Sequence, residues 1–430
     1  MLKDILATIG SRYLIAFLNL ILIFINAKAL GLEGMGLMGL MGASINIIVM
    51  VNGIFGGSTI VYFINKYTIR MILPIVYIWI FIGTGIGCGA MYLLKLLPDG
   101  YLADIYLITI LYSFVIANSR FLLGKDHIKG FNLTNMLQGG LLFFILLYFY
   151  YVTGRKDVSA YIDGLYLTNA IALSASLLIL IPYVVKKGAG PNLPPQKKWP
   201  SLLREMFVYG LWGSADNVAE TCTARLNYFL VQRFAGLGSV GLVDAGTKIA
   251  ESVWNISRSI AYIEYNRIAK TNDATEQTNI THQLFKLAFL AITFVMLCIL
   301  LVPEWIYTDY LFSEEFKGIR KVIAALSLGI IALGCNTILS HYFIGSGKIK
   351  YSTASSCIGL LTLLMAGYWL IPRYGVIGSV ISTSIAFTAM LLFSLTIFIK
   401  QTGSSFRHFL PNRTDWKYIR TCILTRKSVH

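Results

Sequence analysis

Charged and polar side chains recur at helical spacing within two long apolar stretches between about residues 204 and 270. They lie three or four positions apart, at Asp216, Glu220, Thr223 and Asn227 and then at Asp244, Lys248, Glu251, Asn255 and Arg258. This spacing gathers the polar groups on one face of each helix. One charge at the centre of a membrane helix costs roughly 2.5–3.5 kcal/mol. If the helices cross a membrane, these faces must therefore line a wet cavity or contact each other.

The composition indicates an integral membrane protein. Of 430 residues, 56% are hydrophobic and only 13% are charged, whereas soluble domains carry about 25% charged residues. Apolar runs of about twenty residues, long enough to span a bilayer as a helix, recur from end to end. The formal net charge of +16 fits the enrichment of Lys and Arg in the cytoplasmic loops of membrane proteins. Nucleic acid is therefore not an expected partner.

The apolar runs predict twelve membrane-spanning helices. We place them at 9–30, 37–64, 71–94, 104–123, 131–152, 160–185, 206–233, 239–264, 283–303, 320–344, 351–371 and 376–399. Basic residues accumulate on the side that holds both termini, so we expect both termini to be cytoplasmic. The first span imitates a signal peptide, but Arg12, Asn19 and Asn26 recur every seven residues on one face. A cleaved signal would not need this stripe, so we expect a retained helix.

The chain divides into two related halves. We expect an N-terminal six-helix half at 1–185, a basic cytoplasmic linker at 186–204, a C-terminal six-helix half at 205–400 and a basic amphipathic tail at 401–430. The segment at 31–37 is similar to 236–242, and 121–129 is similar to 342–350. With six spans each, both halves enter the membrane from the same side. The predicted fold is all-α, with a pseudo-two-fold axis along the membrane normal and a V-shaped central cavity.

The polar faces of spans 1, 7 and 8 should converge on this cavity. Counting depth at about 1.5 Å per residue predicts that Asp216 pairs with Arg258. The same count predicts that Lys248 and Arg225 are shared among three carboxylates, which are Asp244, Glu251 and Glu220. A structural ion-pair network that only locks two helices together is the alternative. We favour a substrate or coupling-ion site, because ionisable groups within a membrane are rare and commonly functional.

The residue patterns indicate no catalytic site, metal site or disulfide framework. The six cysteines form no CxxC pair, and the five histidines have no metal-ligand spacing. The Gly-rich run at 31–42 lacks the preceding strand and the following Lys-Ser/Thr of a phosphate-binding loop. It predicts a tight turn followed by close helix contact. We therefore expect no enzyme activity, no bound metal and no cofactor, with a proton or sodium gradient as the energy source where one is used.

The chain resembles the multidrug/oligosaccharidyl-lipid/polysaccharide (MOP) exporter superfamily, and within it the Wzx-type flippases of O-antigen and capsule synthesis. The features that carry the resemblance are a first helix with Arg12 and Asn19 that ends in the run at 29–36, the two six-span halves, the basic middle linker and the turn at 373–379. The resemblance implies a transporter in the bacterial cytoplasmic membrane that flips undecaprenyl-pyrophosphate-linked oligosaccharide by alternating access. Its expected partners are this lipid-linked oligosaccharide, membrane lipids and other polysaccharide-assembly membrane proteins.

The resemblance also implies roles for the polar residues. The candidate substrate-binding residues are Arg12, Asn19, Asn26, Arg225, Asn227, Lys248, Asn255 and Arg258. The candidate ion-coupling residues are Asp216, Glu220, Asp244 and Glu251. A drug or organic-cation antiporter of the same superfamily is the main alternative, although the first span carries no carboxylate. A membrane-embedded polysaccharide polymerase is a third possibility, disfavoured because the outer loops are short and hold no evident nucleophile and base.

Overall fold

The computed structural model describes residues 2–185, 199–268, 271 and 273–409, with the side chains of residues 2–9, 212 and 266 left out. This part of the chain is helical and contains no β-strand. The N-terminal half comprises α1 (Leu2–Asn52), α2 (Gly57–Phe63), α3 (Ile69–Leu93), α4 (Leu102–Gly124), α5 (Ile128–Leu147), the π-helical turn η1 (Tyr148–Val152) and α6 (Val158–Val185). The C-terminal half comprises α7 (Trp199–Ala235), α8 (Leu237–Ile268), α9 (Ala274–Leu301), η2 (Ile306–Leu311), η3 (Glu314–Phe316), α10 (Ile319–Gly345), α11 (Ile349–Thr402) and η4 (Phe406–Phe409).

Two of these helices are hairpins that each supply two spans. The backbone of α1 leaves the helical region at Gly31 (φ 67°), and that of α11 does so at Gly375 (φ 53°). Glycine adopts a positive φ without steric cost, so the chain can reverse there. Counting each hairpin twice and adding α3 to α10 gives the twelve predicted spans. Within the described residues, eight helical stretches are long and apolar enough to cross a membrane; α7 and α8 are not among them, because their charges lower the hydropathy.

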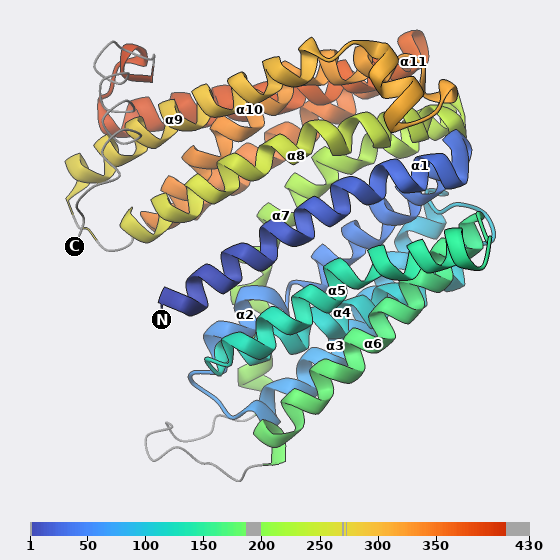
Figure 1. Ribbon diagram of the computed structural model, residues 1–430. Coiled ribbons are helices and arrows are strands. Elements are labelled where there is room, and N and C mark those ends of the chain that lie inside the picture. Colours follow the sequence, from blue (N-terminus) through green and yellow to red (C-terminus); the bar gives the residue numbers. More distant parts are fainter. Residues whose placement is uncertain (1, 186–198, 269–270, 272, 410–430) are drawn as a thin grey trace.

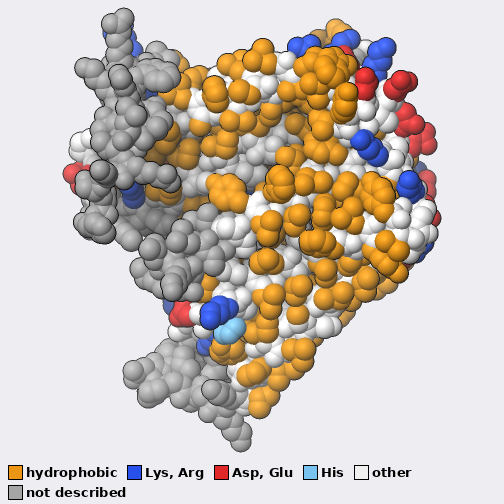
Figure 2. All heavy atoms as spheres, viewed as in Figure 1, with side chains coloured by type: hydrophobic (Ala, Val, Ile, Leu, Met, Phe, Trp, Pro, Cys, Tyr) orange, Lys and Arg blue, Asp and Glu red, His pale blue; other side chains and the backbone are white. Residues whose placement is uncertain are grey.

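The helices form two groups that meet at one end and spread apart toward the end that holds the N-terminus (Figure 1). Helix α1 lies between the groups, in contact with α5 on one side and with α7 and α8 on the other. One face of the molecule carries mainly hydrophobic side chains along the helices, with charged side chains gathered where the groups converge (Figure 2). This distribution is that of a multi-pass membrane protein. The all-α, two-half fold is confirmed.

The two halves repeat the same backbone turns. Residues with a positive φ recur at offsets of 205, 218, 221 and 221 residues, in the pairs Gly31 and Gly236, Gly100 and Gly318, Asp126 and Gly347, and Gly154 and Gly375. A polar contact repeats as well. Asn118 donates to Ser176 at 2.9 Å, and Ser394, 218 residues after Ser176, donates to Asn336 at 2.7 Å. These repeats indicate an internal duplication.

A reciprocal contact marks the pseudo-two-fold axis at the converging end. The Cβ position of Gly36 on α1 faces the carbonyl oxygen of Leu237, and the Cβ position of Gly241 on α8 faces the carbonyl oxygen of Leu32. Gly241 follows Gly36 by 205 residues, and Leu237 follows Leu32 by the same interval. The two backbones approach so closely that only glycine fits at either position.

Three local features differ from the expectation or lie beyond it. The span expected at 37–64 is interrupted, because α1 ends at Asn52 and α2 begins at Gly57. Helix α7 begins at Trp199, so the last six residues assigned to the linker are helical. The rest of the linker (186–198) and most of the expected amphipathic tail (410–430) lie outside the described residues.

Candidate functional site

A cavity of about 540 Å³ lies between the two halves. Eight of the twelve candidate residues line it, which are Arg12, Asn19, Asn26, Arg225, Lys248, Glu251, Asn255 and Arg258. Tyr161 of α6 and Trp254 of α8 complete its polar and aromatic wall. The polar faces of α1, α7 and α8 therefore converge on one space, as their spacing predicts.

Helix α1 supplies most of the wall contributed by the N-terminal half. Its three polar residues, Arg12, Asn19 and Asn26, are seven positions apart and so share a face. The guanidinium of Arg12 lies over the ring of Tyr262 on α8, 5.5 Å from the centroid. Asn26, almost fully buried, accepts a hydrogen bond of 3.1 Å from the hydroxyl of Tyr150. Arg12 thus bridges the halves, while Asn26 is anchored within its own half.

Two ion pairs form on α7 and α8. Arg225 donates to Glu251 at 2.7 Å and to the hydroxyl of Tyr228 at 3.0 Å. Lys248 donates to Asp244, one turn earlier on α8, at 2.7 Å. Asp244 is only 2% exposed and lies behind the cavity wall, while the Lys248 side chain is 33% exposed. These two pairs agree with the prediction, but Glu220, the third carboxylate predicted to share these bases, forms no ion pair with either of them among the described residues.

The predicted pair of Asp216 with Arg258 is wrong. Asp216 accepts hydrogen bonds from Ser352 at 2.8 Å and from Ser356 at 2.6 Å, both on α11. Arg258 lies over the indole of Trp254, 3.6 Å from the ring centroid. The reason is rotation about the axis of α7: the turn that carries Asp216 faces α11, which packs along α7 within the same half.

The remaining two candidates lie away from the cavity wall. Asn227 is 2% exposed and donates to Ser379 at 3.1 Å and Thr383 at 3.0 Å, both on α11. Glu220 is half-buried one turn after Asp216 on α7. The charges of Arg258 and Glu251 lie close enough to Glu220 to act on it. Asn227 therefore holds α7 against α11. Glu220 has no side-chain hydrogen bond and no ion pair among the described residues.

The structure changes the charge balance that the sequence suggests. Four acids and four bases nearly cancel by count, but Asp216 and Asp244 are buried behind the wall in bonds of their own. In the described part of the chain, neither Arg12 nor Arg258 forms an ion pair; each lies over an aromatic ring and reaches the cavity. The cavity wall is therefore cationic, and each half supplies one arginine that forms no ion pair with the described residues.

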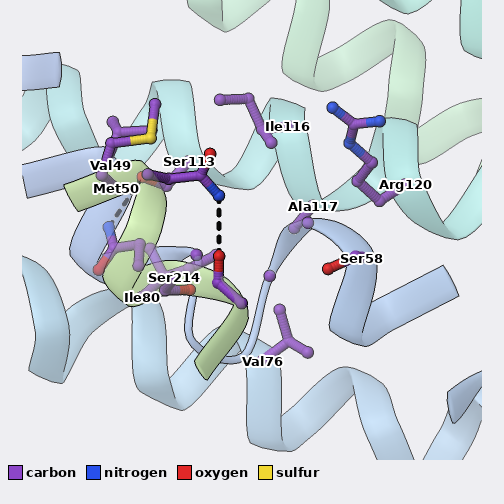
Figure 3. Close-up of a pocket in the computed structure, with 16 residues that line it drawn as sticks. Val49, Met50, Ser58, Val76, Ile80, Ser113, Ile116, Ala117, Arg120 and Ser214 are labelled. Carbon is purple, nitrogen blue, oxygen red and sulfur yellow. Dashed lines mark hydrogen bonds between the residues drawn. The ribbon is translucent and has the colours of Figure 1, made fainter. Parts of the chain in front are cut away.

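Arg120, which is not among the candidate residues predicted from the sequence, lines a second and smaller pocket of about 260 Å³. This pocket lies where α4 meets α2 and α7, and Figure 3 shows Ser58 and Arg120 on one side of it with Ser113 and Ser214 on the other. The charge of Arg120 lies close enough to Arg12 and Tyr262 to interact with them. Arg120 could have been predicted as a candidate from the sequence, because it is a charged residue inside the apolar run at 104–123.

Comparisons with other sequences yield distant relatives. No protein-family model matches the chain. An uncharacterized membrane protein of Methanocaldococcus jannaschii is 21% identical over 230 residues, or 52% of this chain and 45% of that protein. A candidate O-antigen transporter of Shigella flexneri is 21% identical over 183 residues, or 42% of this chain and 44% of that protein. The matched segment thus spans less than half the length of either curated relative.

Solved structures show the fold over nearly the whole chain. A multidrug resistance MATE transporter of the MOP superfamily, in its inward-facing conformation, has a TM-score of 0.69 at 15% identity, over 90% of this chain and 94% of that one. The lipid II flippase MurJ, in an inward closed conformation, has a TM-score of 0.59 at 14% identity, over 100% and 94%. A MOP transporter from Pyrococcus furiosus, noted for the reverse polarity of its binding pocket, has a TM-score of 0.58 at 16% identity, over 93% and 94%. The chain has the fold of MOP-superfamily transporters.

Proposed function

We propose that this protein moves an amphiphile with an anionic oligosaccharide head group, joined to its lipid through a diphosphate, across the membrane by alternating access. The observation that carries the proposal is that Arg12 and Arg258, which form no ion pair with any described residue, line one cavity from opposite halves. Guanidinium groups bind phosphate oxygens through paired hydrogen bonds. Glu251, the carboxylate that lines the cavity among the described residues, is already paired with Arg225, so the wall keeps a net positive charge that attracts such an anion.

The remaining wall suits a glycan. Asn19, Asn255 and Tyr161 offer amide and hydroxyl groups to sugar hydroxyls, and Trp254 offers a flat apolar surface. A lipid tail requires no polar path, because it can stay in the bilayer while the head group passes between the halves. The names of two relatives agree with this assignment, since one is a candidate O-antigen transporter and another a lipid II flippase.

The proposal includes a location and an energy source. Following the distribution of basic residues, we place both termini on the cytoplasmic side of a bacterial cytoplasmic membrane. The cavity then opens toward the cytoplasm, where lipid-linked sugars are assembled. Glu220 and Asp216 are the proposed sites of a coupling proton or sodium ion, and membrane proteins of polysaccharide assembly are the proposed partners.

A drug or organic-cation antiporter is the second candidate, because a multidrug transporter shares the fold with a TM-score of 0.69. The residues that line the cavity disfavour the antiporter function. The polar side chains of α1 that line the cavity are an arginine and two asparagines, and on the opposite wall three basic residues outnumber the one carboxylate, Glu251, among the described residues. An organic cation would meet like charges there. A polymerase is disfavoured because the named relatives and neighbours are transporters.

A deletion strain tests the choice between these functions. The flippase assignment predicts that a lipid-linked oligosaccharide accumulates on the cytoplasmic leaflet and that drug susceptibility is unchanged. Re-expression of the wild-type chain should clear the accumulated lipid, and re-expression of the Arg12→Gln Arg258→Gln double variant should not. Increased drug susceptibility with no accumulated lipid would favour the antiporter instead.

A further inference from the structure

The pocket around Arg120 is separate from the central cavity and is also shared between the halves. The N-terminal half contributes the end of α1, α2, α3 and α4, and the C-terminal half contributes α7. Apolar side chains, among them Val76, Ile80 and Ile116, lie around the pocket and alternate with polar groups (Figure 3). Those polar lining residues are Asn52, Ser58, Ser113, Arg120, Ser214 and Asn217.

The pocket coincides with the break in the second span. The backbone between α1 and α2 lines it, at Gly53 and Gly56 of the connection and at Gly57, the first residue of α2. Non-helical backbone at membrane depth is tolerated where it borders a cavity in the protein, and broken helices recur at transport sites. The sequence predicts an unbroken helix here, so the break is imposed by the fold at the position of the pocket.

Two of the lining side chains lack partners. Arg120 is half-buried and forms neither an ion pair nor a side-chain hydrogen bond within the part of the chain that the structure describes. The side chain of Ser214 is 6% exposed, and its hydroxyl likewise has no hydrogen-bond partner among the described residues. A half-buried charge and a buried hydroxyl normally have hydrogen-bond partners, so we expect a ligand from outside the chain to bind both.

We propose that this pocket is a second anion subsite, which binds a phosphate or carboxylate group through Arg120, Ser214 and Ser58. The proposal rests on the proposed function, because the subsite would hold a second acidic group of the same head group whose first phosphate lies between Arg12 and Arg258. The guanidinium supplies paired donors and the two hydroxyls supply single ones. Since the lining residues belong to both halves, the bound anion would also hold α4 against α7.

Calorimetric titration of the purified, detergent-solubilised protein with inorganic pyrophosphate tests this subsite. The wild-type chain should bind two equivalents. Arg120→Gln should lose one equivalent, or bind it at least about tenfold more weakly, and keep the other. Ser58→Phe, which fills the pocket at an exposed position, should have the same effect without removing a charge. Lys129→Gln removes one exposed charge of α5 outside both cavities and should leave two equivalents.

The outcomes separate the subsite from the proposed function. One equivalent in the wild type, or two in both pocket variants, would overturn the subsite. Unchanged binding in Arg12→Gln Arg258→Gln would instead overturn the central anion site. A second titration tells whether the pocket binds the head group or a free anion. The protein is first saturated with a short-chain diphosphate-linked oligosaccharide and then titrated with pyrophosphate. If the head group fills both sites, no pyrophosphate should bind. One remaining equivalent would show that the pocket takes a free anion and would overturn its role in head-group binding.

Discussion

The guanidinium of Arg258 lies over the indole of Trp254, 3.6 Å from the ring centroid, on the wall of the central cavity. A cation over an aromatic face gains about 0.5–2 kcal/mol, yet the contact uses none of the five N–H donors of arginine. Trp254 is itself fixed, since its indole N–H donates to Thr337 at 2.8 Å. The arginine is therefore held in place with its donors available to a ligand.

Loss of this stacked arginine should lower transport. A charge-assisted hydrogen bond is worth about 1.5–3 kcal/mol, so Arg258→Gln should slow head-group translocation in proteoliposomes by at least about tenfold. Arg258→Lys should retain part of the rate, because the charge remains but the paired donors are lost. Arg233→Gln is the matched control, since Arg233 is an exposed arginine near the end of α7 that lines neither cavity. An equal loss in that control would indicate a general effect of charge.

The converging end is closed by contacts between the α9–α10 connection and the α1 hairpin. Glu315 accepts a hydrogen bond of 2.9 Å from the backbone N–H of Leu32, and Lys28 donates to the carbonyl of Tyr310 at 2.5 Å. Glu315→Ala should weaken this closure by about 1–3 kcal/mol. The open population at this end should therefore rise, which spin labels at the exposed Val152 and Trp305 would report as a longer distance component. An unchanged distance distribution would remove Glu315 from the closure.

The reciprocal glycine contact should tolerate no side chain. A methyl group at Gly36 or Gly241 would overlap a backbone carbonyl of the other half, and forced overpacking typically costs about 1–3 kcal/mol. Gly36→Ala and Gly241→Ala should each lower the thermal unfolding temperature, with similar size because the contact is two-fold. Gly42→Ala, where a Cβ meets nothing within 4 Å, should leave it unchanged or raise it. Different costs at the two symmetric positions would contradict a two-fold contact.

Two buried acids should respond differently to loss of charge. Asp244 holds Lys248 at 2.7 Å, so Asp244→Asn leaves an amine without its ion pair. Because that amine is partly exposed, the cost should be about 1–2 kcal/mol. Glu264 on α8 is 0% exposed, and neither of its carboxyl oxygens has a hydrogen-bond partner among the described residues. Glu264→Gln should therefore not lower stability, since no partner is lost and an unpaired carboxylate is costly to bury. Thermal unfolding of both variants would show the contrast.

The sequence predicted those features that depend on local pattern. Twelve spans, the hairpin at Gly31 and the convergence of Arg12 with the polar faces of α7 and α8 follow from hydropathy, glycine and helical spacing. The partner of Asp216 did not follow, because spacing gives the face of a helix but not the direction in which that face is turned. Nothing in the sequence distinguishes Ser352 and Ser356 from other serines. Only the packing of α11 against α7 places them beside Asp216.

Two further features needed tertiary structure. The break at 53–56 divides an apolar run that reads as one continuous helix, and the contacts of Gly53 with Ser214 and of Gly210 with Ile54 show that α7 crosses there. The cationic surface of the cavity depends on which carboxylates are buried behind its wall. A count of acids and bases cannot show this, because Asp216 and Asp244 enter the count equally with the arginines of the cavity wall.

The central claim is that Arg12 and Arg258 select an anionic head group, and a comparison of two substrates tests it most directly. Translocation in proteoliposomes would be measured for a diphosphate-linked oligosaccharide lipid and for a neutral glycolipid with the same glycan. We predict that the wild-type chain translocates the diphosphate substrate at least about tenfold faster and that Arg12→Gln Arg258→Gln abolishes this preference. Equal rates for the two substrates in the wild type, or an undiminished preference in the double variant, would contradict the account.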